Sequence, residues 1–135
     1  MISTLYKATS LLLLLPSLAF GAIGEVTDYS GSGAIERDDG FEILEIKDEL
    51  GVESMDVVVT EKGKIRIDFI DDTRVDITEH SRLVIDDFVY DPESGTGSLS
   101  LKAGLGTIRY ASGKIAKNSR QSVKITTPSA VVGVR

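Results

Sequence analysis

The chain has 135 residues, no cysteine and one histidine, and its formal net charge is -6 at pH 7. This length matches one domain with a single modest core. The lack of cysteine excludes disulfides, thiolate metal sites and a lipid-modified cysteine, so packing and β ladders must hold the fold. Because the chain is acidic and carries no recognisable nucleic-acid-binding motif, we do not expect it to bind nucleic acid.

The first 21 residues are typical of a secretory signal peptide. Lys7 precedes an apolar run at residues 11–15, and small residues follow near a cleavage point. Cleavage after Gly21 would leave a mature chain that begins at Ala22, and cleavage after Ala19 is the alternative. The apolar run is well short of the ~20 residues that a membrane span needs. We therefore expect no transmembrane span after signal removal, and a periplasmic, extracellular or cell-surface location.

Charge is distributed unevenly along the chain. All 21 acidic residues lie at or before Glu93, and residues 22–93 carry a balance of -14, whereas residues 94–135 carry +7. Either the two parts pack together and neutralise one another, or the basic part is a docking face for an anionic partner. The candidate partner-binding cations are Arg109, Lys114, Lys117, Arg120, Lys124 and Arg135.

The first part of the predicted mature chain has a short and broken apolar pattern. Residues 24–46 are interrupted by turn-forming clusters at 29–33 and 38–40. Apolar residues from Phe41 onward follow a mixed period. We favour short strands here, and a brief helix over residues 42–50 is the alternative, because short apolar runs do not separate the two.

The middle of the chain alternates more regularly. Ile65, Ile67 and Phe69 alternate with Arg66 and Asp68, which predicts a half-buried strand. Further apolar pairs are Val57 with Val59, Val75 with Ile77, Leu83 with Ile85, Phe88 with Tyr90, and Leu99 with Leu101.

The spacing of these pairs predicts the fold class. From Val57 to Leu101 they recur about every eight to ten residues, with turn residues between them. Residues 106–117 and 123–135 add two more β-like segments joined by a polar bridge. The prediction is a single all-β domain over residues 22–135, made of short antiparallel or coiled strands. Both a β-solenoid-like roll and a β-sandwich fit, because no strict residue repeat is visible.

No residues combine into a known catalytic or metal-binding motif. His80 is the only histidine and lies in a polar turn, and no serine lies in a Gly-x-Ser-x-Gly elbow. The acidic pairs at 38–39, 71–72 and 86–87 lack the spacing of calcium loops and are interpreted as solvated turns. Two of these pairs could also be partners for the basic C-terminal strands. We predict no enzymatic activity, no catalytic residue, no metal site and no cofactor.

An ordered set of short strings resembles the FecR domain. The strings include residues 56–60, 67–73 and 106–110. Met55 and Asp72 depart from the pattern, because the family usually has glycine at both positions. The positions that carry the resemblance, with an expected structural role, are Asp56, Thr60, Asp71, Gly106, Arg109, Gly113, Thr127, Pro128 and Gly133.

The resemblance implies a non-enzymatic interaction or sensor module of the bacterial envelope. The best-known members of the family are transmembrane regulators that control a sigma factor and sense a loaded outer-membrane transporter. The expected partner here is an unidentified envelope protein, bound through the strand edge near residues 131–135 or through the basic side chains named above. The alternative is a structural domain or fragment of a longer surface protein. The last string stops at Arg135, where the family continues with Gly-Thr, so we expect a C-terminally incomplete domain.

Overall fold

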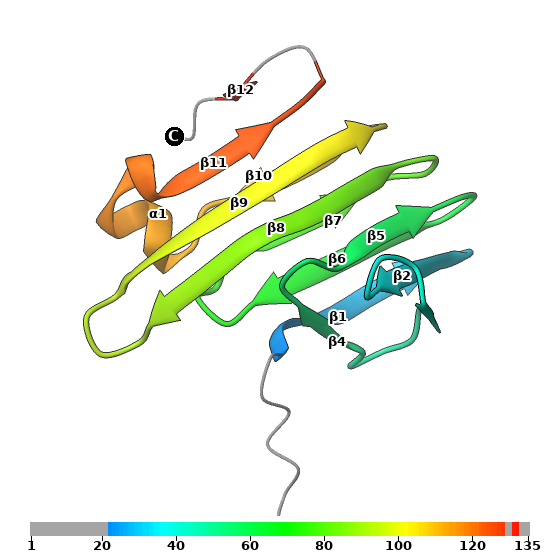
Figure 1. Cartoon of the computed structure of the whole chain (residues 1–135), viewed down its shortest axis with the longest axis horizontal. Coiled ribbons are helices and arrows are strands. Elements are labelled where there is room, and N and C mark those ends of the chain that lie inside the picture. Colours follow the sequence, from blue (N-terminus) through cyan, green and yellow to red (C-terminus); the bar gives the residue numbers. More distant parts are fainter. Residues whose placement is uncertain (1–21, 129–130, 133–135) are drawn as a thin grey trace, which may run out of the picture.

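A computed structural model describes residues 22–128 and 131–132, and in it the chain forms two β-sheets that pack face to face (Figure 1). The predicted signal segment lies outside the described residues, and the first strand begins at Ala22. The smaller sheet has the order β10-β7-β6-β1-β4, and the larger sheet has the order β12-β11-β9-β8-β5-β2-β3. The strands of the smaller sheet are β1 (Ala22–Ser30), β4 (Gly51–Glu53), β6 (Lys64–Phe69), β7 (Arg74–Ile77) and β10 (Ile108–Ala111). Those of the larger sheet are β2 (Gly33–Arg37), β3 (Glu42–Glu45), β5 (Val57–Thr60), β8 (Arg82–Asp91), β9 (Thr96–Leu105), β11 (Val123–Thr126) and β12 (Val131–Val132).

One hydrophobic core lies between the sheets. Ile67 of the smaller sheet and Leu83 of the larger sheet are both fully buried in it. The rings of Phe69 and Phe88, from opposite sheets, stack with their centroids 5.4 Å apart. The all-β prediction is therefore confirmed, and of the two architectures that fitted the sequence the described residues form a sandwich.

Alternation predicted the inner faces of most strands correctly. Ile65, Ile67 and Phe69 of β6 point into the core. In β8, two apolar pairs of opposite phase lie on a single strand. The register shifts between Ile85 and Asp87, and this irregularity returns Phe88 to the inner face after the phase change.

The pairing of Val57 with Val59 predicted the wrong inner face for β5. Val58 is fully buried, whereas Val57 and Val59 are half-buried on the outer face of the larger sheet. The residues that share the inner face with Val58 are Asp56 and Thr60. Both are polar, and their burial is offset by hydrogen bonds that the local sequence does not reveal.

The three acidic pairs have three different environments. Asp38 and Asp39 form an exposed turn, as predicted. The interpretation as solvated turns is wrong for the other two pairs, because Asp71 is fully buried and residues 86–87 lie within β8. Of the pair at 71–72, only Asp72 is exposed.

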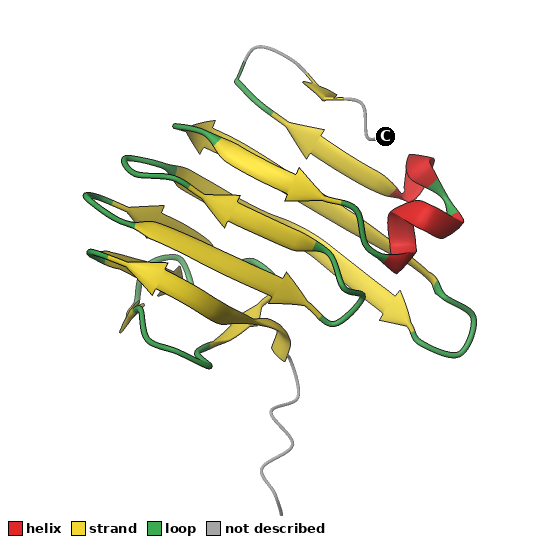
Figure 2. Ribbon diagram, turned by 180° about the vertical axis from the view of Figure 1, so that it is seen from behind, coloured by secondary structure: helices red, strands yellow, loops and turns green. Residues whose placement is uncertain are grey.

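The predicted β-like segment 106–117 is a strand followed by a helix. The strand β10 ends at Ala111, and helix α1 (Lys114–Asn118) and a 3-10 turn (Arg120–Ser122) follow it. Ile115 is therefore buried on a helix and not on a strand. Figure 2 shows that α1 carries the chain from the edge of one sheet to the other. There β11 pairs in parallel with β9, so this crossover makes the parallel pairing possible.

Strands β2 and β3 form a hairpin, which confirms strands rather than a helix over residues 42–45. Ile46, at the base of the hairpin, is buried. In contrast, Phe41 is 95% exposed and Ile43 is 67% exposed. The mixed apolar period in this stretch therefore combines one core residue with two that face solvent.

Candidate interaction site

A buried ion pair anchors the turn end of the β2–β3 hairpin, where Arg37 is the last residue of β2. Arg37 donates from Nε and Nη2 to the two carboxylate oxygens of Asp56, each at 2.9 Å, and Nη2 also donates to the carbonyl of Gly51 at 3.0 Å. The Asp56 side chain is fully buried. This hydrogen-bonded carboxylate raises the pKa of Arg37. The pair ties β2 to the turn between β4 and β5, and therefore sets the direction in which the hairpin leaves the sheet.

A second buried carboxylate joins the β6–β7 turn to helix α1. Asp71 accepts hydrogen bonds from the backbone N–H of Thr73 at 3.0 Å, from its hydroxyl at 2.8 Å, and from the N–H of Ile115 at 3.2 Å. Gly113 packs against this turn, because a Cβ there would lie 2.3 Å from the Thr73 nitrogen. Asp71 therefore starts the helix, and no side chain larger than that of glycine fits at Gly113 without a backbone shift.

A third polar cluster joins the end of β5 to the starts of β8 and β10. The hydroxyl of Thr60 donates to the carbonyl of Thr78 at 2.6 Å and accepts from the N–H of Ser81 at 2.9 Å. The N–H of Thr107 donates to the hydroxyl of Ser81 at 3.2 Å. Gly106 has a φ of +79°, and a Cβ on it would lie 2.0 Å from the Ser81 hydroxyl. The hydrogen-bonding groups of all three clusters are thus engaged in holding turns.

The two positions that depart from the family pattern adopt a left-handed backbone. Met55 has a φ of 73° and Asp72 has a φ of 69°. Non-glycine residues are strained in this region, whereas glycine is not. The left-handed backbone at these two positions therefore explains why the family usually has glycine there.

We expect Met55→Gly to raise the free energy of unfolding by roughly 0.5 to 1 kcal/mol, because it relieves left-handed strain and removes a side chain that is 63% exposed. Equilibrium denaturation in urea measures the change. Met55→Ala is the matched control, since it removes the side chain but keeps the strained backbone. Equal stabilisation by both variants would show that the side chain, not the backbone, is responsible.

The outer face of the smaller sheet carries a row of alternating charge. Across β10, β7, β6 and β1, the cross-strand neighbours are Arg109, Asp76, Arg66 and Asp28. Arg66 donates to Asp76 at 2.7 Å, which lowers the pKa of that carboxyl. This row lines a hollow of about 300 Å³. Since its charges are balanced within the row, this face offers little net charge to a partner.

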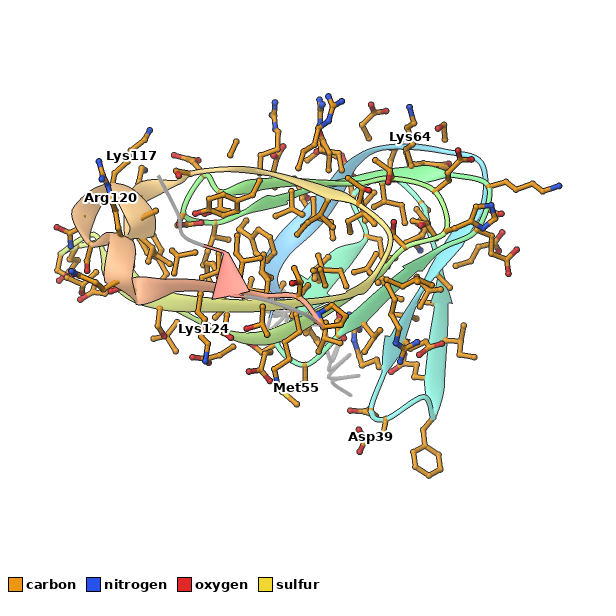
Figure 3. All side chains as sticks on the ribbon, turned by 90° about the horizontal axis from the view of Figure 1, so that it is seen from above. Asp39, Met55, Lys64, Lys117, Arg120 and Lys124 are labelled. Atoms are coloured by element: carbon orange, nitrogen blue, oxygen red, sulfur yellow. The ribbon has the colours of Figure 1, made fainter. Side chains whose placement is uncertain are left out.

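The predicted partner-binding cations do not form one patch. Lys114 pairs with Asp72 at 3.3 Å, and Arg109 lies in the charged row of the smaller sheet. Figure 3 places Lys117 and Arg120 on one side of the molecule and Lys124 on the opposite side. None of these last three forms an ion pair with another residue in the part of the chain that the structure describes. Arg135 and Gly133 lie outside the described residues, as does most of the predicted edge at 131–135.

The charged halves of the chain neutralise one another only in part. Lys114 with Asp72 is one link between residues 94–135 and residues 22–93. Lys102 with Asp86, at 3.5 Å, is the other such ion pair among the residues that the structure describes. Thr127 and Pro128 follow β11 directly, and a proline there cannot donate a ladder hydrogen bond. Mutual neutralisation therefore holds for Lys102 and Lys114, and the docking role of the other basic residues stays a prediction.

The outer face of the larger sheet is more apolar than the charged outer face of the smaller sheet. Val57 lies beside Val84 across β5 and β8, and both are half-buried. Met55, 63% exposed, lies on the same side of the molecule as the tip of the β2–β3 hairpin at Asp39 (Figure 3). A hollow of about 220 Å³ lies here, lined by Glu36, Asp39, Gly40, Met55, Val57 and Arg82.

The β2–β3 hairpin projects beyond this face as a wall of the hollow (Figure 3). Its outer strand β3 is the last strand of the larger sheet and, within the described chain, pairs only with β2. The exposed apolar side chains of Phe41 and Ile43 lie on it or next to it. Sequence reasoning missed this site because it counted those residues with the apolar pattern, although their mixed period was a signal.

The described residues show neither a metal cluster nor a membrane helix. No three His, Cys, Asp or Glu side chains among them are placed to hold a metal ion. His80 is exposed in a turn with a φ of 52°. Its backbone N–H donates to the backbone carbonyl of Glu61 at 2.8 Å. No helix in the described ranges combines the length and hydropathy required to traverse a bilayer.

The described chain is thus a two-sheet β domain whose buried polar motif residues hold turns and whose free edge carries exposed apolar side chains. A family model described as FecR protein matches residues 56–135, so the chain belongs to the FecR family. This is a family of sensing and regulatory proteins rather than enzymes. No curated protein and no solved structure matches the chain. The match starts at Asp56, and the β2–β3 hairpin therefore lies outside it, although the hairpin belongs to the larger sheet of the same sandwich.

Proposed function

We propose that this chain is a non-enzymatic interaction module of the FecR type that works in the bacterial envelope, in the periplasm or at the cell surface. Membership of a sensing family supports a regulatory role, and the signal-like segment at residues 1–21 supports export. The observation that carries the proposal is the projecting β2–β3 hairpin. A hairpin with an unpaired edge and exposed apolar side chains is a surface suited to binding another polypeptide.

The buried carboxylates support the proposal that the function is non-enzymatic. Asp56 and Asp71 are the two fully buried carboxylates, and both are saturated by hydrogen bonds that fix the main chain. Each lies under a turn and neither lines the hollows on the outer faces. A general acid or base must instead reach the substrate within hydrogen-bonding distance.

Capture from the native envelope tests the function. The exported protein, immobilised through a C-terminal tag, is exposed to detergent-solubilised envelope extract, and any captured protein is then purified and titrated against it. We expect a saturable one-to-one complex. Recovery of no partner, while an established FecR sensor domain captures its own partner in parallel, would contradict the proposal.

A further inference from the structure

We propose that the free edge of β3 binds an extended, positively charged segment of another protein as an added β-strand. The preferred segment has the pattern cation, apolar, apolar, cation. This inference rests on the proposed function and describes the chemistry of the partner that the module recognises.

The edge has backbone groups available for pairing. Among the described strands, β3 lies at the end of the larger sheet and pairs with β2 alone. One side of the Glu42–Glu45 backbone therefore presents N–H and C=O groups that no described strand pairs. The hairpin also stands away from the body of the sandwich (Figure 3), and β3 is the last described strand of its sheet, so an added strand would lie directly beside it. An added strand satisfies such groups directly.

The side chains of β3 define the chemistry of the added strand. The strand reads Glu42, Ile43, Leu44, Glu45. Leu44 is opposite the buried Ile35 and packs against the core, so it shares the inner side with Glu42, while Ile43 and Glu45 share the outer side. Each side thus offers one carboxylate and one apolar group. Because directly opposite residues interact across strands, the complement is a cation, two apolar residues and a second cation, in either strand direction.

Uncompensated negative charge surrounds the edge. Residues 36–49 contain seven carboxylates and two basic residues, and in this stretch only Glu36 and Arg37 form ion pairs with described residues. The other six carboxylates are exposed and have no ion-pair partner within the described chain. They attract a basic segment and favour its rapid association. These six are Asp38, Asp39, Glu42, Glu45, Asp48 and Glu49.

The same charges argue against a second copy of this chain as the occupant. Antiparallel pairing of two β3 edges places Glu42 of one copy opposite Glu45 of the other, and like charges directly opposite are destabilising. Three basic side chains without an ion-pair partner among the described residues are a poor match as well. Lys117 and Arg120 lie on the opposite side of the molecule from Lys124, so they do not form one basic strand (Figure 3). A basic strand of a different protein fits the edge better.

Titration with synthetic peptides tests the proposal. The ¹⁵N-labelled protein, purified after export, is titrated with the peptide Ser-Lys-Val-Val-Lys-Ser and followed by amide chemical shifts. We expect saturable shifts centred on β3, with affinity that falls as salt increases. Glu45→Lys should weaken binding roughly tenfold. Glu93→Lys makes the same charge change in the exposed loop between β8 and β9 and should leave the affinity within about twofold.

Two further peptides separate the contributions of charge and backbone pairing. Exchange of both lysines for glutamate should abolish binding to the natural protein and restore it to the Glu42→Lys/Glu45→Lys protein. Methylation of both valine nitrogens keeps the charge but removes the donors, and should also abolish binding. Shifts centred on the charged row of the smaller sheet, undiminished binding of the methylated peptide, or self-association that depends on Glu45 would overturn the proposal.

The outcomes also separate this inference from the proposed function. A native partner that binds equally well to the Glu45→Lys protein would leave the function standing and refute the β3 site. Peptide binding at β3 without any envelope partner would support the site and contradict the function.

Discussion

Replacing Arg37 with methionine is expected to lower the free energy of unfolding by about 3 to 5 kcal/mol, because the variant leaves the Asp56 carboxylate buried without its counter-ion. Methionine keeps most of the apolar stem, so the loss reports the charge and its hydrogen bonds more than the packing. Urea denaturation, followed by circular dichroism, measures the change. The same variant also releases the tether to the Gly51 carbonyl, so the β2–β3 hairpin should gain faster amide hydrogen exchange than the rest of the sheet.

Two companion variants make this expectation specific. Arg82→Met removes an exposed pair with Glu36 and should cost less than about 1 kcal/mol. The double variant Arg37→Met/Asp56→Leu removes the unpaired buried charge and should recover part of the loss. If Arg37→Met costs no more than Arg82→Met, the buried pair does not hold the hairpin.

Replacing Ile67 with alanine is expected to cost about 2 to 4 kcal/mol, because Ile67 is fully buried at the centre of β6 and the deletion leaves a cavity between the two sheets. The exposed Lys62, in the turn before β6, is the control. Lys62→Ala should change stability by no more than about 0.5 kcal/mol. A denaturation midpoint for Ile67→Ala equal to that of the control would contradict the inward assignment of this face.

Strands with one buried and one exposed face were predictable from the sequence. In β6 and β7 the inward residues are aliphatic or aromatic and the outward residues are charged, so alternation alone shows the inner face. The helix α1 was not predictable in this way. It has five residues, too few to show a repeating helical pattern in the sequence. Its first turn depends on a hydrogen bond to Asp71, which is distant in sequence.

The error in β5 shows the limit of hydrophobic patterning. Its inner face includes Asp56 and Thr60, which would be costly to bury without partners. Their partners are Arg37 and Ser81, about twenty residues away in opposite directions. The outward phase contains two of the three consecutive valines and the inward phase only one, so patterning favours the wrong face and only these tertiary contacts show which valine points inward.

The candidate site was visible in the sequence only as composition. The excess of acidic residues around Phe41 and Ile43 can be read directly. Its position at the end of a sheet depends on the order in which distant strands pair. In the larger sheet β5 pairs with β2 and β8, and neither is next to β5 in the sequence. A local pattern does not encode that order.

The pairing of β11 with β9 has a consequence for how the domain folds. The β6–β7 and β8–β9 hairpins join strands that are neighbours in sequence, whereas β9 and β11 meet only after the chain has crossed through β10 and α1. The pairing of β1 with β6 is also non-local. Contacts between distant residues carry the larger loop-closure entropy and slow the search for the native state. The topology therefore favours a nucleus in the middle of the chain, with β1 and β11 added from either end as the steps that limit the folding rate.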